Sequence, residues 1–383
     1  MRIEAKKVEL FELFYDLVFV YAISRVTLLL EEPVGGVFTF EQFFVYIIST
    51  LAVLQSWMYM TNYINRYGQW RWYEYVFLSI NMFAAIFMSQ TIKPEWDAAT
   101  ARMFLVSIMT MIVTVICLYV IQMHKKEQDI GAAKNGVMCL SIVLLLFIAT
   151  LSATYTALDS RAYYLLSIAV LAGAFIPFIV PKFYDPGIVN FPHLVERYEL
   201  LTIITFGEGV VGMTVFFDLY ELSNVPWLVF LTIFLLFVCY VIQIHHLCDH
   251  HRVDRGLWLM FSHYFVILSV NLIDVAYLLF SNVEGDHQFT ATLMFIALAV
   301  FFLSILANSV YYHKGIPFHA TDILISLMFV ALGAAIAFLY MDSPYGFLLG
   351  ALTAASGNFL LLMHKFHKFK GTLPSEDGAE GTG

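Results

Sequence analysis

Long apolar runs alternate with short polar stretches along the whole chain. A helix of about 20 apolar residues spans the hydrocarbon core of a bilayer, and it pairs its own backbone groups where water cannot reach them. We therefore expect an all-α integral membrane protein. The pattern predicts twelve transmembrane helices, at residues 9–30, 41–63, 72–92, 100–123, 135–158, 161–181, 196–219, 225–247, 256–280, 289–312, 319–341 and 343–364.

The composition agrees with this class, because 61% of the 383 residues are hydrophobic and only 13% are charged. Acidic residues interrupt the first apolar run and no small-residue cleavage site follows it, so we do not expect a cleavable signal. The four cysteines are scattered and predict no disulfide framework. No phosphate-binding loop or HExxH motif occurs. The sequence therefore indicates no cofactor and no nucleic-acid partner, and leaves membrane lipids and a small solute or ion; the oligomeric state stays open.

The positions of lysine and arginine predict the orientation. With a cytoplasmic N terminus, fifteen of them fall on the cytoplasmic side, and three, Lys93, Arg102 and Arg161, on the outer side. Cytoplasmic loops of membrane proteins carry an excess of Lys and Arg. We therefore expect both termini in the cytoplasm and a multi-pass protein of the cell membrane.

The two halves of the chain are related by an offset of 187 residues, which carries VELFELF at 8–14 onto VERYELL at 195–201. The same offset carries each further span of the first half onto one of the second within a few residues. Six spans per half give both halves one orientation, as in parallel repeats. We expect a first six-helix repeat at 1–180, a cytoplasmic connection at 181–194, a second repeat at 195–367 and a disordered cytoplasmic tail at 368–383.

Charged residues interrupt the first predicted helix. Glu9, Glu12 and Asp16 stand at i, i+3 and i+7 and so share one face. Arg25 lies nine residues beyond Asp16, roughly 13.5 Å along the helix axis, and needs a partner from another helix. A charge near the bilayer centre costs roughly 2.5–3.5 kcal/mol on insertion scales. These side chains are therefore expected to have partners, water or a function.

The seventh predicted helix carries a second charged set with Arg197, Glu199 and Glu208. Counted from the cytoplasmic end, Arg197 lies at a depth from which it reaches Glu12 of the first helix. Asp274 of the ninth helix lies at the depth of Arg25, and Glu208 about one turn shallower. The spacing predicts crossed ion pairs between the two repeat-related helices. Such pairs either serve transport or proton relay, or only fix the register of the helices.

Two segments, ELFYDLVFVYAIS near the N terminus and TFGEGVV in the seventh helix, resemble the bacterial low temperature requirement protein A (LtrA) family. The likeness covers essentially the whole chain. It implies a protein of this length and span number, from a family named for a growth phenotype and without a secure reaction or substrate. The family's pattern positions correspond to Glu12, Phe14, Asp16, Gly207, Glu208 and His263. The predicted functional core is Glu12, Asp16, Arg25, Arg197, Glu199, Glu208, His263 and Asp274.

A histidine-rich stretch, HHLCDHH at 245–251, ends the eighth predicted helix. On a helix, His245 with Asp249 and His246 with His250 are i, i+4 pairs, a spacing that can hold a divalent metal. A cationic helix end that faces lipid headgroups explains the stretch without a metal. Since no third ligand converges, we predict no metal site, with His246 and His250 as weak candidates. The tryptophans, including Trp57, are interpreted as packing or interface residues near the ends of the spans, and none is assigned to a binding site.

The sequence favours a secondary carrier or permease for a small solute or ion. In it, Asp16 or Glu208 changes protonation or binds a cation, and Arg25 and Arg197 are counter-charges. The polar groups reach from the cytoplasmic end into the middle of two helices, which favours a pathway. The alternatives are a membrane-embedded enzyme acting on lipids or headgroups, which uses His263 and the histidine cluster, and a structural or stress-adaptation membrane protein.

Overall fold

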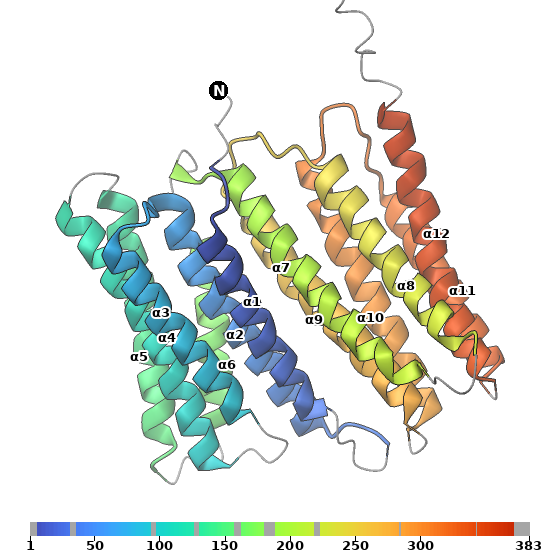
Figure 1. The fold of residues 1–383 in the computed structure, drawn as a ribbon, viewed down its shortest axis with the longest axis horizontal. Helices are drawn as coiled ribbons and strands as arrows, with labels where there is room; N and C mark the ends of the chain where they lie inside the picture. The colour runs from blue at the N-terminus through green and yellow to red at the C-terminus, as the bar shows by residue number, and fades with distance from the viewer. Residues whose placement is uncertain are drawn as a thin grey trace, which may run out of the picture. The chain divides into compact units, whose positions relative to one another are not determined.

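The computed structural model describes residues 6–30, 36–92, 97–125, 130–156, 162–179, 188–217, 223–282, 285–341 and 343–370. These residues form twelve α-helices and no named strand (Figure 1). Ten of the helices are long and apolar enough to cross a membrane; α3 and α6 fall outside these ten. The chain is therefore a multi-pass helical membrane protein. Residues 181–187 of the predicted connection at 181–194 and residues 371–383 of the predicted tail at 368–383 lie outside the described residues. Residues 368–370 of that tail are helical.

The chain divides into two compact units. The first unit contains Met1–Thr205 and His251–Tyr264, and the second contains Phe206–His250 and Phe265–Gly383. The division falls inside α7 (Phe191–Gly212) and α9 (Leu257–Ser281), so each of these helices contributes to both units. The start of α7 lies five residues before the predicted position 196, because Pro192 fits the first turn of a helix and does not end it.

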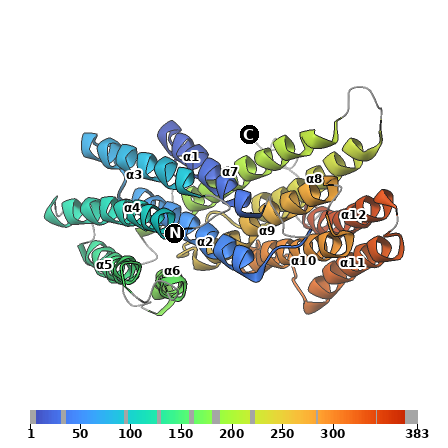
Figure 2. The ribbon, with the colours of Figure 1, turned by 90° about the horizontal axis from the view of Figure 1, so that it is seen from below.

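In the first unit, five helices follow one another around α2. The neighbours in this ring are α1 with α3, α3 with α4, α4 with α5, and α5 with α6, while α2 packs against α1, α4 and α6 (Figure 2). The central position leaves α2 with two buried faces. The helices are α1 (Leu10–Thr27), α2 (Phe40–Tyr67), α3 (Trp72–Thr91), α4 (Ala98–Lys125), α5 (Ile130–Ala153) and α6 (Ala162–Ile179).

Local sequence fixes the start of α2, and a distant lysine binds its end. At its start, the Thr39 hydroxyl accepts a hydrogen bond from the Gln42 amide at 3.2 Å, and Gln42 Oε1 accepts from the Thr39 amide at 2.9 Å. At its end, Lys6 Nζ donates to the carbonyl oxygens of Ile64 at 2.8 Å and Gly68 at 3.0 Å. Burial lowers the pKa of Lys6. The segment before α1 is thus tied to the end of α2.

The cationic side chains of the first unit bind at different ends of the helices. Lys6 binds the C-terminal end of α2, and Lys125, at the end of α4, lies 3.3 Å from the Tyr73 hydroxyl at the start of α3. Arg102, in the first turns of α4, donates to the Thr154 carbonyl after α5 at 2.6 Å. These positions follow the alternating direction of successive helices.

The second unit contains α8 (Val225–Tyr240), α10 (His287–Ala307), α11 (Ala320–Leu339) and α12 (Pro344–Lys370). A π-helical segment, Val241–Leu247, extends α8. The backbones of α11 and α12 approach so closely that a Cβ atom at Gly333 would collide with the Gly350 carbonyl. Large apolar side chains such as Leu324 and Met328 are exposed on α11, as expected for a surface that faces lipid.

Candidate functional site

Two carboxylates of α1 are completely buried in the first unit. Glu12 and Asp16 are one turn apart and both are 0% exposed. Glu9, the third acid of the predicted stripe, precedes the helix and is exposed. Its backbone amide donates to Glu12 Oε1 at 3.3 Å. Only the two deeper acids of the stripe therefore belong to a buried site.

Arg197 of α7 binds both carboxylates and is itself 0% exposed. Its Nη1 pairs with Glu12 Oε2. Its Nη2 pairs with Asp16 Oδ1, and its Nε donates to Asp16 Oδ2 at 3.0 Å. The two bonds to Asp16 form a bidentate pair, the strongest geometry for arginine and carboxylate. The expected contact between Arg197 and Glu12 is present, and one cation serves two anions.

One face of α2 completes this group, which we call the charge network. Trp57 Nε1 donates to Asp16 Oδ1 at 2.7 Å, and the Thr61 hydroxyl lies 3.5 Å from Arg197 Nη2. The guanidinium carbon of Arg197 also lies 5.7 Å from the Trp57 ring centre. Trp57 is in the middle of α2 and 1% exposed. Of the two interpretations, packing and membrane interface, this burial fits packing, and the buried indole needs an acceptor, which Asp16 provides.

His193, in the first turn of α7, extends the charge network. It is 0% exposed, and its Nε2 lies 3.0 Å from Glu12 Oε2. Its Nδ1 lies 2.9 Å from Asn65 Nδ2 of α2. An asparagine amide nitrogen only donates, so His193 Nδ1 accepts and Nε2 carries the proton toward Glu12. With this tautomer His193 is neutral, and Glu12, Asp16 and Arg197 together carry a formal charge of −1.

Asn190 fixes the orientation of the Asn65 amide. The backbone N–H of Asn190 donates to Asn65 Oδ1 at 3.1 Å, and Asn65 Nδ2 donates to the Asn190 carbonyl at 2.8 Å. Asn190 also begins α7 as its cap, because its Oδ1 accepts from the His193 amide at 3.1 Å. A proton on His193 Nδ1 would face the Asn65 amide donor. His193 therefore takes part in the contact between α2 and the start of α7.

Aromatic rings connect His263 of α9 to the charge network. The Tyr198 ring lies 4.9 Å from the Trp57 ring and 4.8 Å from the His263 ring. His263 is 0% exposed, and its Nδ1 lies 2.7 Å from the Leu259 carbonyl, to which it donates. This bond leaves Nε2 of the neutral ring as an acceptor. The predicted core residue His263 therefore adjoins the network through two rings.

The family model of the bacterial low temperature requirement A protein (LtrA) matches residues 7–355, which include every part of the charge network. The chain belongs to the LtrA family. No curated protein matches the chain. The resemblance that the sequence motifs indicated is thereby confirmed over almost the whole length of the chain.

The positions of the LtrA pattern separate in the structure. Glu12 and Asp16 are in the charge network, whereas Phe14, between them, is 56% exposed on another face of α1. Gly207 faces open space, since a Cβ atom there would meet nothing within 4 Å. Glu208 belongs to the second unit. The pattern of this LtrA chain therefore combines buried polar positions with surface positions.

A second acidic pair lies in the second unit. A Cβ atom at Gly209 of α7 would lie 2.6 Å from Asp274 Oδ1 of α9, so glycine is required for this approach. Asp274 also interacts electrostatically with Glu208. Within the described residues, no ion pair joins Glu208 or Asp274 to a lysine or arginine. We call these two residues the acidic pair.

Two predicted core residues remain apart from these groups. Arg25 is half-buried on α1, and its Nε is buried without a hydrogen-bond partner among the described residues. Its expected partner Asp274 belongs to the second unit, and their pairing stays a prediction. Glu199 of α7 is half-buried, two residues after Arg197 and therefore on another face.

The histidine-rich stretch does not have the predicted helical spacing. Helical structure ends at Leu247, and Cys248 is extended and bridges to Tyr312. The His245 ring lies 5.7 Å from the His250 ring, while the His246 ring packs 4.9 Å from Phe366. The i, i+4 pairing of His246 and His250 was wrong, because the chain leaves the helix between them. In the part of the chain that the structure describes, no three His, Cys, Asp or Glu side chains gather as a metal site requires.

Sequence reasoning missed four residues in or next to the charge network: Trp57, Thr61, Asn65 and His193. A signal for them exists in the helical spacing. His193 lies four residues before Arg197 and so shares its face, and Trp57, Thr61 and Asn65 follow one another at intervals of four. The sequence shows that this face of α2 is polar, but it does not show which helix packs against it.

Proposed function

We propose that this LtrA-family protein is a secondary carrier for a small solute or ion in the cell membrane. The observation that carries the proposal is Arg197, buried between Glu12 and Asp16 on helices long enough to cross a bilayer. A buried ion pair often stabilises a fold no more than apolar residues of the same volume. Ionisable side chains inside a membrane commonly mark a substrate, ion or proton pathway.

The architecture we propose for this carrier is two parallel six-helix repeats with both termini in the cytoplasm. The similarity of residues 8–14 and 195–201 supports it. Some helix contacts also recur in helices numbered six higher: α5 packs on α6 and α2 on α6, as α11 packs on α12 and α8 on α12. Parallel repeats of this size occur in known secondary carriers.

In this proposal His193 receives the transported proton. Its charged partner is Glu12 on α1, which Arg197 on α7 also binds, and Lys6 before α1 interacts electrostatically with Glu12 and Arg197. Because Arg197 compensates only one of the two carboxylates, the network has a formal charge of −1 when His193 is neutral. A proton on His193 would bring this formal charge to zero.

The same proton provides a route to conformational change. On Nδ1 it would meet the Asn65 amide, which must then rotate and lose its two bonds to the Asn190 backbone. Protonation would therefore release α2 from the start of α7. Alternating access needs such a link between a bound ion and a helix contact.

Flux measurements test the proposal. The full chain is reconstituted into vesicles that contain a pH-sensitive dye, and sodium, potassium and acetate salts are added outside in turn. We expect a dye response above that of protein-free vesicles, and its loss in His193→Gln, where the amide still donates to Glu12 but does not titrate. His246→Gln at the end of α8 is the matched control and keeps the response. An unchanged response in a folded His193→Gln protein would refute the proton role.

A scaffolding role is the competing explanation, because the same contacts tie α1, α2 and α7 together. It predicts that the network matters for stability alone. The response of His193→Gln separates the two explanations, since this variant keeps the contact with Glu12 and removes only the titration.

A further inference from the structure

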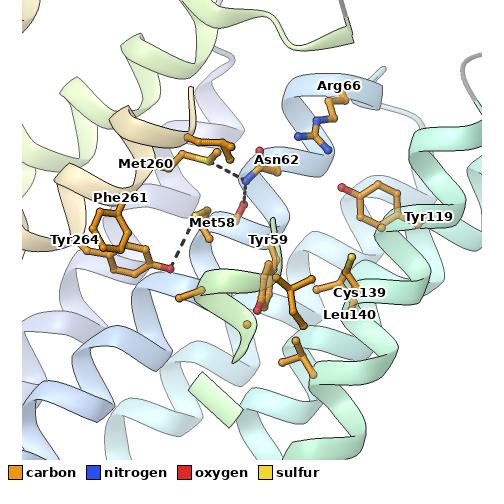
Figure 3. A pocket seen from close by; sticks show the side chains of 16 residues that line it. Met58, Tyr59, Asn62, Arg66, Tyr119, Cys139, Leu140, Met260, Phe261 and Tyr264 are labelled. Atoms are coloured by element: carbon orange, nitrogen blue, oxygen red, sulfur yellow. Dashed lines mark hydrogen bonds between the residues drawn. The ribbon is translucent and has the colours of Figure 1, made fainter. Parts of the chain in front are cut away.

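Cavities of the two units differ in size. In the first unit, Met58 of α2 and Leu140 of α5 line a cavity of about 70 Å³ (Figure 3). In the second unit, a cavity of about 160 Å³ lies where α9 and α11 end and where α10 and α12 begin. An apolar cavity of about 150 Å³ binds benzene. The second-unit cavity is therefore large enough for one aromatic ring, whereas the first-unit cavity is not.

The apolar walls of the second-unit cavity come from four helices. Phe280 of α9 and Phe347 of α12 line it and stack on one another, with their ring centres 4.5 Å apart and an angle of 15° between the rings. Ala291 of α10 and Ala337 of α11 contribute only methyl groups beside these rings. Aromatic rings pair favourably in offset or edge-to-face arrangements. The walls therefore favour a ligand that has an aromatic ring.

One residue of the cavity lining has a buried hydroxyl without a partner. Thr290 of α10 is 1% exposed, and its Oγ1 makes no hydrogen bond within the described residues. Thr292 on the same helix differs, because its hydroxyl donates to the Gln288 carbonyl at 2.7 Å. A buried polar group without a hydrogen bond costs free energy. A ligand that brings a hydrogen-bonding oxygen to Thr290 would remove this cost.

The lining of the second-unit cavity favours a neutral ligand. Among the described residues that line it, none is a lysine, arginine, aspartate or glutamate. His287 is the only titratable side chain among them, and it is exposed, as is Pro344 at the start of α12. These two residues are at the side from which a ligand enters. An ion in the cavity would lose its hydration without gaining an opposite charge.

We propose that the second-unit cavity binds a small neutral aromatic alcohol of the size of phenol. The ring of the ligand lies against Phe280 and Phe347. The hydroxyl of the ligand forms a hydrogen bond with Thr290 Oγ1, which can both donate and accept. The site lies within the second unit alone and uses no residue of the charge network. The proposal goes beyond the carrier function and does not require that the ligand be transported.

Ligand binding measured by fluorine NMR tests the proposal. The full chain is placed in lipid nanodiscs and titrated with 4-fluorophenol, and separately with fluorobenzene, which has the ring without the hydroxyl. Empty nanodiscs measure the partition of each probe into lipid, which does not saturate. We expect saturable binding of both probes to the protein. The binding of 4-fluorophenol should be about fivefold tighter, as one net hydrogen bond provides.

The variant Thr290→Val removes the hydroxyl and keeps the branched shape of the side chain. It should weaken the binding of 4-fluorophenol about fivefold and leave the binding of fluorobenzene unchanged. Its melting temperature should equal or exceed that of the native chain, because the substitution removes a buried hydroxyl that has no partner. Thr292→Val is the matched control: it removes an exposed hydroxyl of the same helix and should leave the binding of both probes unchanged.

A second variant, Ser343→Phe, fills the cavity from its rim and should abolish the saturable binding of both probes. Its melting temperature and chromatographic profile show whether it is folded, and if it is not, the comparison of the two threonine variants decides alone. The proposal is overturned if the native chain shows no saturable binding, if Thr290→Val leaves the binding of 4-fluorophenol unchanged, or if folded Ser343→Phe still binds. A lower melting temperature of Thr290→Val would also overturn it, because the hydroxyl would then have a partner. None of these results bears on flux through the charge network.

Discussion

The carboxylates within the helices of the two units have different surroundings: Glu12 and Asp16 are buried, whereas Glu208 and Asp274 are half-buried. In the first unit, Glu12 and Asp16 share Arg197 and accept further hydrogen bonds, including one from Trp57. In the second unit, Glu208 and Asp274 interact with each other, and within the described residues no cation pairs with them. Arg197 compensates the negative charge of the first pair of carboxylates, whereas no cation among the described residues compensates that of the second pair.

The two sites therefore differ in how the charge of their carboxylates is compensated. Glu208 and Asp274 repel one another when both are ionised. In the charge network, Arg197 binds both carboxylates. Substitutions that remove charge should separate the two sites clearly.

The largest effect is expected for Arg197→Gln. It leaves Glu12 and Asp16 buried without their cation, and breaking a buried pair typically costs about 3–5 kcal/mol. The melting temperature of the purified protein in detergent should fall strongly. Arg252→Gln, whose side chain is partly exposed in a 3.7 Å ion pair with Asp254, should change little. Equal melting temperatures for the two variants would contradict the compensated network.

Asp16→Asn should cost less than Arg197→Gln, since Glu12 and Arg197 remain as a neutral pair. The new amide places one donor against the guanidinium, and the loss of a charged hydrogen bond is worth about 3 kcal/mol at most. Asp274→Asn should be silent or stabilising, because it removes a like charge from the acidic pair. Thermal melting of both variants checks the contrast. A larger loss for Asp274→Asn than for Asp16→Asn would reverse the comparison.

Trp57→Phe tests the α2 side of the charge network. It removes the indole donor to Asp16 and should destabilise the protein by about 1.5 kcal/mol, the lower range for a bond to a charged group. Trp227→Phe is the matched control, because Trp227 is 72% exposed. Chemical denaturation of both variants should show a loss for Trp57→Phe only. Unchanged stability in Trp57→Phe would show that α2 does not stabilise the charge network.

The smallest effect concerns Lys6. Burial lowers its pKa from 10.5, so the unfolded chain binds this proton more tightly than the folded chain. The contribution of Lys6 to stability therefore rises as the pH increases through the folded-state pKa toward 10.5, and it is smallest below. Lys6→Gln should lack this rise. Melting temperatures of both proteins over this pH range measure the difference, and parallel curves would contradict it.

The sequence predicted the helices well, because apolar length alone defines a membrane span. It also predicted the contact of Arg197 with Glu12, since depth along two helices follows from residue number. The contacts of Asn65 and Trp57 were not predictable in this way, because they depend on how α2 is rotated against α1 and α7. The π-helical segment Val241–Leu247 was missed because its residues have an ordinary helical pattern.

A charge-neutral network tests the central claim most directly. The triple variant Glu12→Gln, Asp16→Asn, Arg197→Gln removes every charge of the buried triad and keeps hydrogen-bonding groups of similar size. Its dye-reported flux is measured in vesicles beside the native protein, with the melting temperature as the measure of folding. If the protein is a carrier that uses these charges, the triple variant folds and is more stable than Arg197→Gln alone, but it shows no flux. Native flux in this folded variant would contradict the account and leave the network as scaffolding.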